Sequence, residues 1–147
     1  MTDTSLTERW RSWSPQLLSV LRIIAAFLFM QAGTAKLVAF PAAVMPGGGT
    51  APLASLPGVA GLLETVGGAL LLVGLFTRPV AFILSGLMAF AYFIGHAGNG
   101  FWPVLNGGAP AVFYCFLWLF FSAGGAGPWS LDALRSRGMS PAPPMRA

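Results

Sequence analysis

Residues 58–76 read GVAGLLETVGGALLLVGLF, with Glu64 as the single ionisable side chain. A helix needs about 20 predominantly apolar residues to cross the hydrocarbon core of a bilayer. The length and composition of this run therefore predict a transmembrane helix. Ala60, Glu64 and Gly68 recur every four residues on it, which puts small side chains on one face and allows a neighbouring helix to approach closely.

Three further apolar runs flank this one, at about residues 17–40, 79–97 and 110–123. Together the four runs predict an all-α, polytopic membrane protein whose bundle of four transmembrane helices occupies residues 17–123. We expect the first run to be retained as a helix and not removed as a signal peptide. Residues 1–16 precede the bundle, and residues 124–147 are predicted to form a short interfacial helix (131–137) and a proline-rich, disordered tail (141–144).

The composition excludes most soluble classes. Of 147 residues, 56% are hydrophobic and 8% are charged, whereas a soluble domain carries about 25% charged residues. Aromatic residues make up 13% of the chain, which excludes a disordered protein. Eight Lys and Arg residues are too few for a nucleic-acid-binding surface, so we expect no nucleic-acid partner.

The distribution of basic residues predicts the orientation. The first and third connections, residues 41–57 and 98–110, contain no Lys or Arg. The remaining basic residues outside the apolar runs lie at the N-terminus, in the second connection or at the C-terminus, namely Arg9, Arg11, Arg78, Arg135, Arg137 and Arg146. Because cytoplasmic loops are enriched in Lys and Arg, both termini are predicted to be cytoplasmic. Arg22, Arg78 and Trp129 are predicted to anchor the bundle at that interface, with Arg22 extending its side chain to the headgroups.

Four ionisable residues fall inside the predicted spans: Arg22, Lys36, Glu64 and His96. A charged side chain at mid-membrane costs roughly 2.5–3.5 kcal/mol, so each such residue needs a partner or a function. At about 1.5 Å per residue, Lys36, Glu64 and His96 lie at similar depth in the outer half of the bilayer. We expect a Lys36–Glu64 ion pair facing the bundle interior, with His96 above it. Three interpretations remain open. Lys36 extends its ammonium to the outer headgroups, or the Lys36–Glu64 pair only specifies how the helices pack, or the pair is part of a functional site that relays protons or anchors a ligand.

The residues present restrict the chemistry of such a site. A single cysteine excludes an intrachain CxxC pair, and a single histidine offers no haem or metal ligand set, so we predict no metal and no intrinsic cofactor. An apolar pocket with a few polar groups at its mouth suits a quinone. The predicted quinone-binding residues are Lys36, Glu64, His96, Trp102 and Asn106, and the catalytic candidates are Glu64 and His96.

Several segments together resemble the DoxX family of small four-helix membrane proteins. The second run resembles the family's second helix, and the first run resembles its first helix. The motifs that carry the resemblance are Glu64-Thr-Val-Gly67-Gly68, Leu70 to Arg78, Leu21-Arg22, Gly33-Thr-Ala-Lys36-Leu37, His96 with Gly98, Asn106-Gly-Gly108 and Gly125 to Asp132. One departure is Ala109-Pro110, where the family often has a carboxylate after the Asn-Gly-Gly turn. The likeness covers roughly residues 17–132.

The resemblance implies a prokaryotic cytoplasmic-membrane protein associated with redox systems, such as a small subunit of quinone-linked oxidases. Our first hypothesis is a non-catalytic accessory subunit of a membrane oxidoreductase or electron-transfer complex, surrounded by lipid and by other membrane subunits and contributing to a quinone site. A second is a quinone-linked oxidoreductase subunit in which Glu64 or His96 moves protons and Lys36 polarises a quinone carbonyl. A third is a small-solute or proton carrier.

Overall fold

The computed structural model describes residues 4–138, and all of its regular structure is helical. The helices are α1 (Thr4–Val38), α2 (Leu56–Val73), α3 (Thr77–Gly95), the 3-10 helix η1 (Ala97–Asn99), α4 (Ala109–Gly124) and α5 (Leu131–Gly138). The predicted all-α class is confirmed. The predicted proline-rich tail lies outside the described residues.

Three segments within the described residues are long and apolar enough to cross a membrane: Leu6–Val38, Leu56–Val73 and Thr77–Asn99. The fourth apolar helix, α4, has 16 residues. A four-span count therefore stays a prediction.

Helix α1 begins at Thr4, 13 residues before the predicted boundary at residue 17. Pro15 lies inside it without ending the helix. At about 1.5 Å per residue, 35 residues extend roughly 52 Å, well beyond the ~30 Å hydrocarbon core.

Helix α2 ends at Val73, before the predicted residue 76, because Gly74 adopts a left-handed conformation (φ 69°) that terminates the helix. A side chain at Gly74 would also overlap Ser130, and it would lie 2.5 Å from Arg22 Nη1. The following residues 75 and 76 form a tight turn, and α3 begins immediately afterwards at Thr77.

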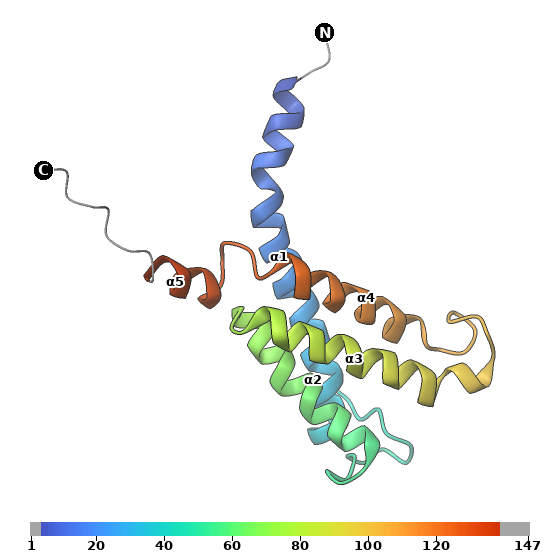
Figure 1. Cartoon of the computed structure of the whole chain (residues 1–147). Helices are drawn as coiled ribbons and strands as arrows, with labels where there is room; N and C mark the ends of the chain where they lie inside the picture. Colours follow the sequence, from blue (N-terminus) through green and yellow to red (C-terminus); the bar gives the residue numbers. More distant parts are fainter. Residues whose placement is uncertain (1–3, 139–147) are drawn as a thin grey trace, which may run out of the picture.

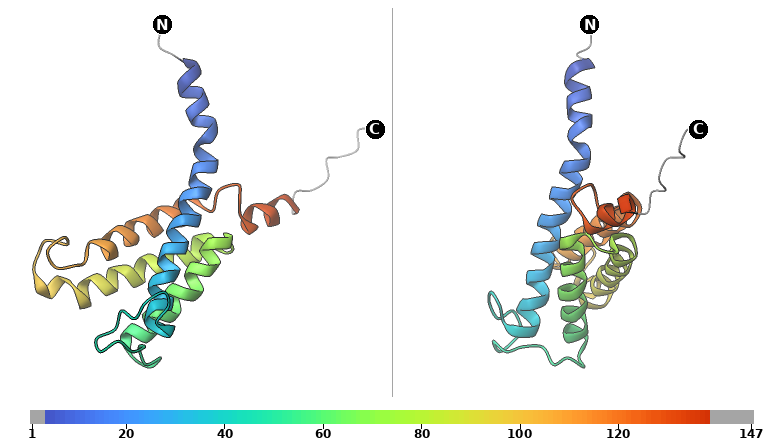
Figure 2. Two further views of the ribbon diagram at one scale, coloured as in Figure 1. Left: turned by 180° about the vertical axis from the view of Figure 1, so that it is seen from behind. Right: turned by 90° about the vertical axis from the view of Figure 1, so that its left-hand side faces the viewer.

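The helices form two antiparallel hairpins, α1 with α2 and α3 with α4. The hairpins splay apart away from the loop that joins α4 to α5 (Figures 1 and 2). They are joined by a core in which Phe29 of α1 contacts Tyr114 and Trp118 of α4, at ring-centroid distances of 5.0 and 5.3 Å. The other buried members of this core are Ala25, Ala26, Leu71, Ala81, Leu84, Met88 and Phe121.

Glycines set the spacing of α1 and α2. A Cβ on Gly33 would lie 2.6 Å from the carbonyl oxygen of Gly61, and one on Gly68 would lie 3.0 Å from Met30 Cβ. Small residues let two helix backbones approach closely inside a membrane. This close approach fixes the register of the two helices, and thereby places residue 36 of α1 opposite residue 64 of α2.

Candidate functional site

The structure brings together the two opposite charges that the sequence places on neighbouring helices. The ammonium of Lys36, in the last turn of α1, contacts both carboxylate oxygens of Glu64, with a distance of 2.6 Å to Oε1. The Glu64 side chain is 4% exposed and that of Lys36 is 25% exposed. Glu64 is therefore enclosed in protein, whereas Lys36 keeps one side open.

The open side of this pair lies on a cavity of about 240 Å³ between the two hairpins. One wall comes from α1 and α2, and the other comes from α3, α4 and the connection between them. The lining residues are Phe29, Ala32, Lys36, Glu64, Met88, Ala91, His96, Gly107, Pro110, Ala111 and Tyr114. Lys36, Glu64 and His96, which are 60 residues apart in the sequence at their extremes, thus share one cavity.

His96 follows the last residue of α3, and the connection to α4 fixes its ring. Its Nδ1 lies 3.1 Å from the backbone oxygen of Asn106. Because a carbonyl oxygen only accepts hydrogen bonds, Nδ1 carries the proton in this arrangement. A neutral His96 consequently keeps Nε2 as a free acceptor.

Asn106 and Trp102, the two residues of the α3–α4 connection that were predicted to bind a quinone, do not line the cavity. Asn106 uses its side chain inside the connection, donating to Gly100 O (2.8 Å) and accepting from Gly108 N (2.8 Å). Its contribution to the site is thus to position His96. Trp102 is 63% exposed and does not line the cavity. The structure does not place Trp102 over the Lys36–Glu64 pair.

Sequence reasoning missed Tyr114 and Met88, which also face the cavity. Tyr114 stacks on Trp118 at a centroid distance of 5.7 Å and supplies a phenol to an otherwise apolar wall. Its spacing from Ala111 and Trp118 follows the helical period of buried positions on α4, and this pattern is the signal that points to an inward orientation.

Arg22 corrects the sequence prediction of an anchor that reaches the headgroups. The side chain is fully buried. Its guanidinium donates to the carbonyl oxygens of Leu71 (2.6 Å) and Leu72 (3.0 Å) at the end of α2, and to those of Ala126 (2.9 Å) and Trp129 (2.6 Å) in the α4–α5 connection. The prediction was wrong because carbonyl groups freed by the end of α2 and by the connection satisfy the guanidinium inside the protein.

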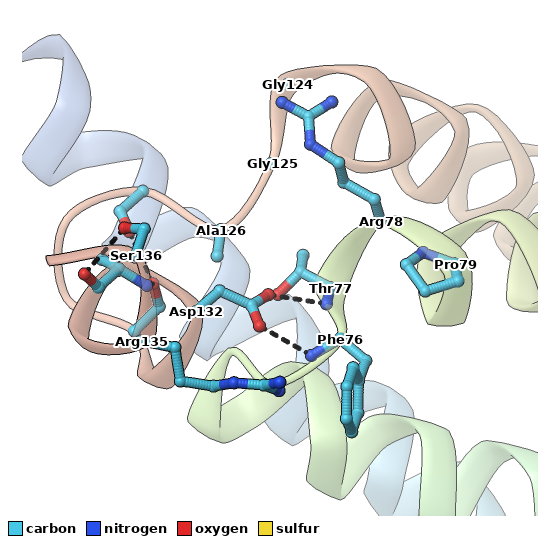
Figure 3. Close-up of a pocket in the computed structure, with 13 residues that line it drawn as sticks. Phe76, Thr77, Arg78, Pro79, Gly124, Gly125, Ala126, Asp132, Arg135 and Ser136 are labelled. Carbon is cyan, nitrogen blue, oxygen red and sulfur yellow. Dashed lines mark hydrogen bonds between the residues drawn. The ribbon is translucent and has the colours of Figure 1, made fainter. Parts of the chain in front are cut away.

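Arg78 and Asp132 complete this end of the bundle, beside an open groove of about 580 Å³ (Figure 3). Arg78 donates to the carbonyl oxygens of Ser122 and Ala123 at the end of α4, and Trp129 is exposed. Asp132 accepts from the backbone N–H groups of Phe76 (2.9 Å) and Thr77 (2.8 Å) at the start of α3. These polar groups bond to helix ends, so this region organises the fold.

The contacts of Asp132 at the start of α3 also change the pKa of its carboxyl group. Burial raises the pKa of its carboxyl, but the hydrogen bonds from the backbone N–H groups of Thr77 and Phe76, together with the positive charge of Arg135, outweigh burial. The net result is a pKa below the ordinary value of 3.8. Asp132 is therefore held as a carboxylate at the α3 N-terminus.

Within residues 4–138, no group of three or more His, Cys, Asp or Glu side chains is placed to hold a metal ion. Cys115 is a free, half-buried thiol beside Ser85. The chemistry available at the cavity is consequently that of an ammonium, a carboxylate, an imidazole and a phenol.

Comparison with known proteins identifies the family. The family model described as DoxX matches residues 17–97, which is more than half of the chain. The chain belongs to the DoxX family. An uncharacterized protein of Haemophilus influenzae is 47% identical over 123 residues, covering 82% of this chain and 91% of its own length. No solved structure matches.

This DoxX protein is a multi-pass membrane protein. The matched region includes Lys36, Glu64 and His96, and it ends before Asn106 and Tyr114. The ionisable side of the cavity thus falls within the DoxX match, and the part of its wall contributed by α4 falls outside it.

Proposed function

We propose that this DoxX protein is an accessory subunit of a prokaryotic membrane oxidoreductase or electron-transfer complex, and that its cavity contributes to a quinone site. In this proposal four helices cross the cytoplasmic membrane, and both termini are cytoplasmic. Family membership, apolar helices and the distribution of Lys and Arg support the proposal.

The observation that carries the proposal is the enclosure of Lys36, Glu64 and His96 in one cavity whose remaining walls are mostly apolar. Ionisable groups inside a membrane protein are costly and are usually placed for a function. If the Lys36–Glu64 pair served packing alone, it would not need to open onto a cavity next to an imidazole and a phenol.

The dimensions and chemistry of the cavity fit a quinone head group. An enclosed volume of roughly 150 Å³ holds a benzene molecule, so about 240 Å³ accommodates a substituted ring. Phe29 and Met88 provide apolar contacts for the ring, and Lys36 provides a donor for a carbonyl oxygen. A bound quinone would supply two-electron, two-proton redox chemistry, which no side chain of this protein supplies.

In this site each residue has a separate task. Lys36 orients the ligand through a charge-assisted hydrogen bond. Glu64 keeps Lys36 in place and neutralises its charge in the low-dielectric interior. The Nδ1–H of His96 donates a hydrogen bond to the backbone oxygen of Asn106, so the imidazole holds or accepts a proton at Nε2.

A second candidate is an oxidoreductase subunit with its own proton chemistry. The specific observation in its favour is that Glu64 and His96, both able to exchange protons, line the same cavity. It differs from the first candidate in requiring that turnover depend on Glu64 as a proton carrier and not only on assembly.

The test is purification of the full chain in a mild detergent from native membranes. We expect co-purifying membrane subunits and an extractable quinone that is lost in Lys36→Met but retained in the control Arg78→Gln, which changes a cation outside the cavity. A stable particle of this chain alone that binds no added short-chain quinone would overturn the proposal. Glu64→Gln distinguishes the two candidate functions. If the variant assembles normally with its partner subunits but the complex no longer turns over quinone, the second candidate, in which Glu64 carries protons, is supported.

A further inference from the structure

The N-terminal part of α1 stands away from the rest of the molecule (Figures 1 and 2). The bundle ends near Ser19 and Arg22, where these residues bond to the α4–α5 connection. At about 1.5 Å per residue, Trp13 lies about 9 Å beyond Ser19, Trp10 about 13 Å and Leu6 about 20 Å. If the edge of the hydrocarbon core is placed at Ser19, where the bundle ends, a headgroup layer of roughly 5–8 Å leaves Trp10 and Leu6 beyond the headgroups in a continuous helix.

This projecting segment carries a narrow apolar stripe. Leu6, Trp10, Trp13 and Leu17 are its large apolar residues, and all are exposed, Trp10 to 70% and Trp13 to 62%. The positions between them are Thr, Glu, Arg, Arg, Ser, Ser, Pro and Gln. Two apolar positions per seven residues, spaced alternately four and three apart, are the pattern of a coiled-coil seam.

The same spacing continues along α1 into the apolar span, through Val20, Ile24 and Phe27, which are also exposed. These residues lie two positions from the buried Arg22, Ala26 and Phe29. Residues two apart on a helix are separated by about 200°, so the seam and the bundle-facing side are nearly opposite. A partner on the seam therefore does not compete with α2 for α1.

We propose that the face formed by Leu6, Trp10, Trp13, Leu17, Val20, Ile24 and Phe27, the α1 seam, binds the α1 seam of a second copy of this chain. Two copies inserted in one membrane have parallel α1 helices, so a two-fold axis along the membrane normal brings each seam against itself. Pro15 occupies an outward position in this register, and no charged residue occupies the seam. The inference does not depend on the quinone proposal.

Gln31 supports a self-complementary partner. It is the next position of the same repeat, and its side-chain amide has no hydrogen-bond partner among residues 4–138. An amide both donates and accepts, so two Gln31 side chains satisfy each other across the two-fold axis. A single polar side chain at such a position also selects the register.

The available area agrees with a dimer. An aromatic side chain has roughly 150–250 Å² of surface, so the exposed fractions of the seven seam residues correspond to on the order of 700 Å² per copy. A standard protein–protein interface buries roughly 800 Å² on each partner, which is close to this area. With the hydrocarbon edge placed at Ser19, lipid covers the seam within the bilayer but does not reach Leu6 and Trp10. A second copy covers both parts with one surface.

The experiment is cysteine cross-linking of the full chain in native membranes. The single native thiol is removed by Cys115→Ser, and one cysteine is introduced by Trp10→Cys or Trp13→Cys. Matched controls are Glu8→Cys and Ser12→Cys, which lie on the same exposed segment but off the seam. We expect covalent dimers several-fold more abundant from the two seam positions. Equal cross-linking at all four positions, no dimer at any of them, or cross-links only to a different protein would overturn the proposal.

A second measurement does not depend on introduced thiols. In vesicles that contain donor- and acceptor-labelled copies, Trp10→Ser with Trp13→Ser should lower the dimer association constant about tenfold or more, since aromatic anchors dominate interface energies. The control Trp102→Ser removes an exposed tryptophan of the α3–α4 connection, which is not part of the α1 seam, and should leave energy transfer unchanged. The proposal that the α1 seam forms the dimer interface would be contradicted if energy transfer were undiminished in the double variant, or if the control lost as much energy transfer as the double variant.

Discussion

Replacing Arg22 by Met tests the most buried charged side chain among residues 4–138. The substitution keeps an unbranched side chain of similar length but removes every N–H of the guanidinium. Four hydrogen bonds to backbone carbonyl groups disappear, two at the end of α2 and two in the α4–α5 connection. The C-terminal segment thereby loses its main polar link to α1.

The expected cost follows from these contacts. Hydrogen bonds from charged donors contribute about 1.5–3 kcal/mol each, but the losses are not additive, and Leu71 O also accepts from Gly74 N. Removing one side of a buried charged network typically costs about 3–5 kcal/mol. Against a total unfolding free energy of about 5–15 kcal/mol, Arg22→Met should remove a large fraction of the stability.

The chain contains its own reporter for this measurement. Cys115 is the single thiol and is half-buried on α4, so a thiol-reactive dye follows unfolding of the detergent-solubilised protein during heating. We expect a clearly lowered Tm for Arg22→Met, together with faster proteolysis between residues 126 and 130. Arg22→Lys should recover only part of the loss, because one ammonium cannot span both sets of carbonyls.

The control is Arg78→Met, which removes an exposed arginine that also bonds to helix-end carbonyls. Its effect should be small because water replaces the lost donor. If Arg22→Met and Arg78→Met lower the Tm equally, or if neither does, the assignment of Arg22 as a buried structural link is refuted.

Three further predictions follow from other contacts. In a double-mutant cycle, Glu64→Gln and Lys36→Met should each lower the Tm, and the double variant should lose less than the sum of the two; strict additivity would show that the ion pair contributes nothing. Gly33→Leu should separate α1 from α2 and cost at least about 1–3 kcal/mol, because even a Cβ there overlaps Thr65 Oγ1; a Tm unchanged from the wild type would contradict the close approach. Because the pKa of Asp132 is lowered in the folded state, its carboxylate contributes fully to stability above the ordinary value of 3.8, and this contribution is lost as the pH falls through the lower folded-state value. Asp132→Asn should therefore flatten the dependence of Tm on pH in this range. If the slope of Tm against pH stays unchanged in the variant, other groups cause the pH dependence.

Much of the architecture follows from local sequence. Runs of about 20 apolar residues have few stable alternatives to a membrane helix, since backbone polar groups must be satisfied within the segment. The helix ends were less predictable. The left-handed Gly74 ended α2 three residues early, and α1 continued through Pro15 to Thr4, because such ends depend on local backbone geometry and capping.

The amino-acid sequence by itself determined the helical class and the number of apolar runs, because length and hydropathy are properties of single segments. It predicted a Lys36–Glu64 pair only as one of several alternatives, because the cost of a buried charge calls for a partner without saying which one. Tertiary structure alone decided the rest. Arg22 turned inward because carbonyl groups from residues 71–72 and 126–129 converge on it, from about 50 and more than 100 positions away. Tyr114 joined the cavity because two hairpins that meet at Phe29 splay apart around it. Contacts between distant segments set both outcomes, and periodicity within one helix does not encode them.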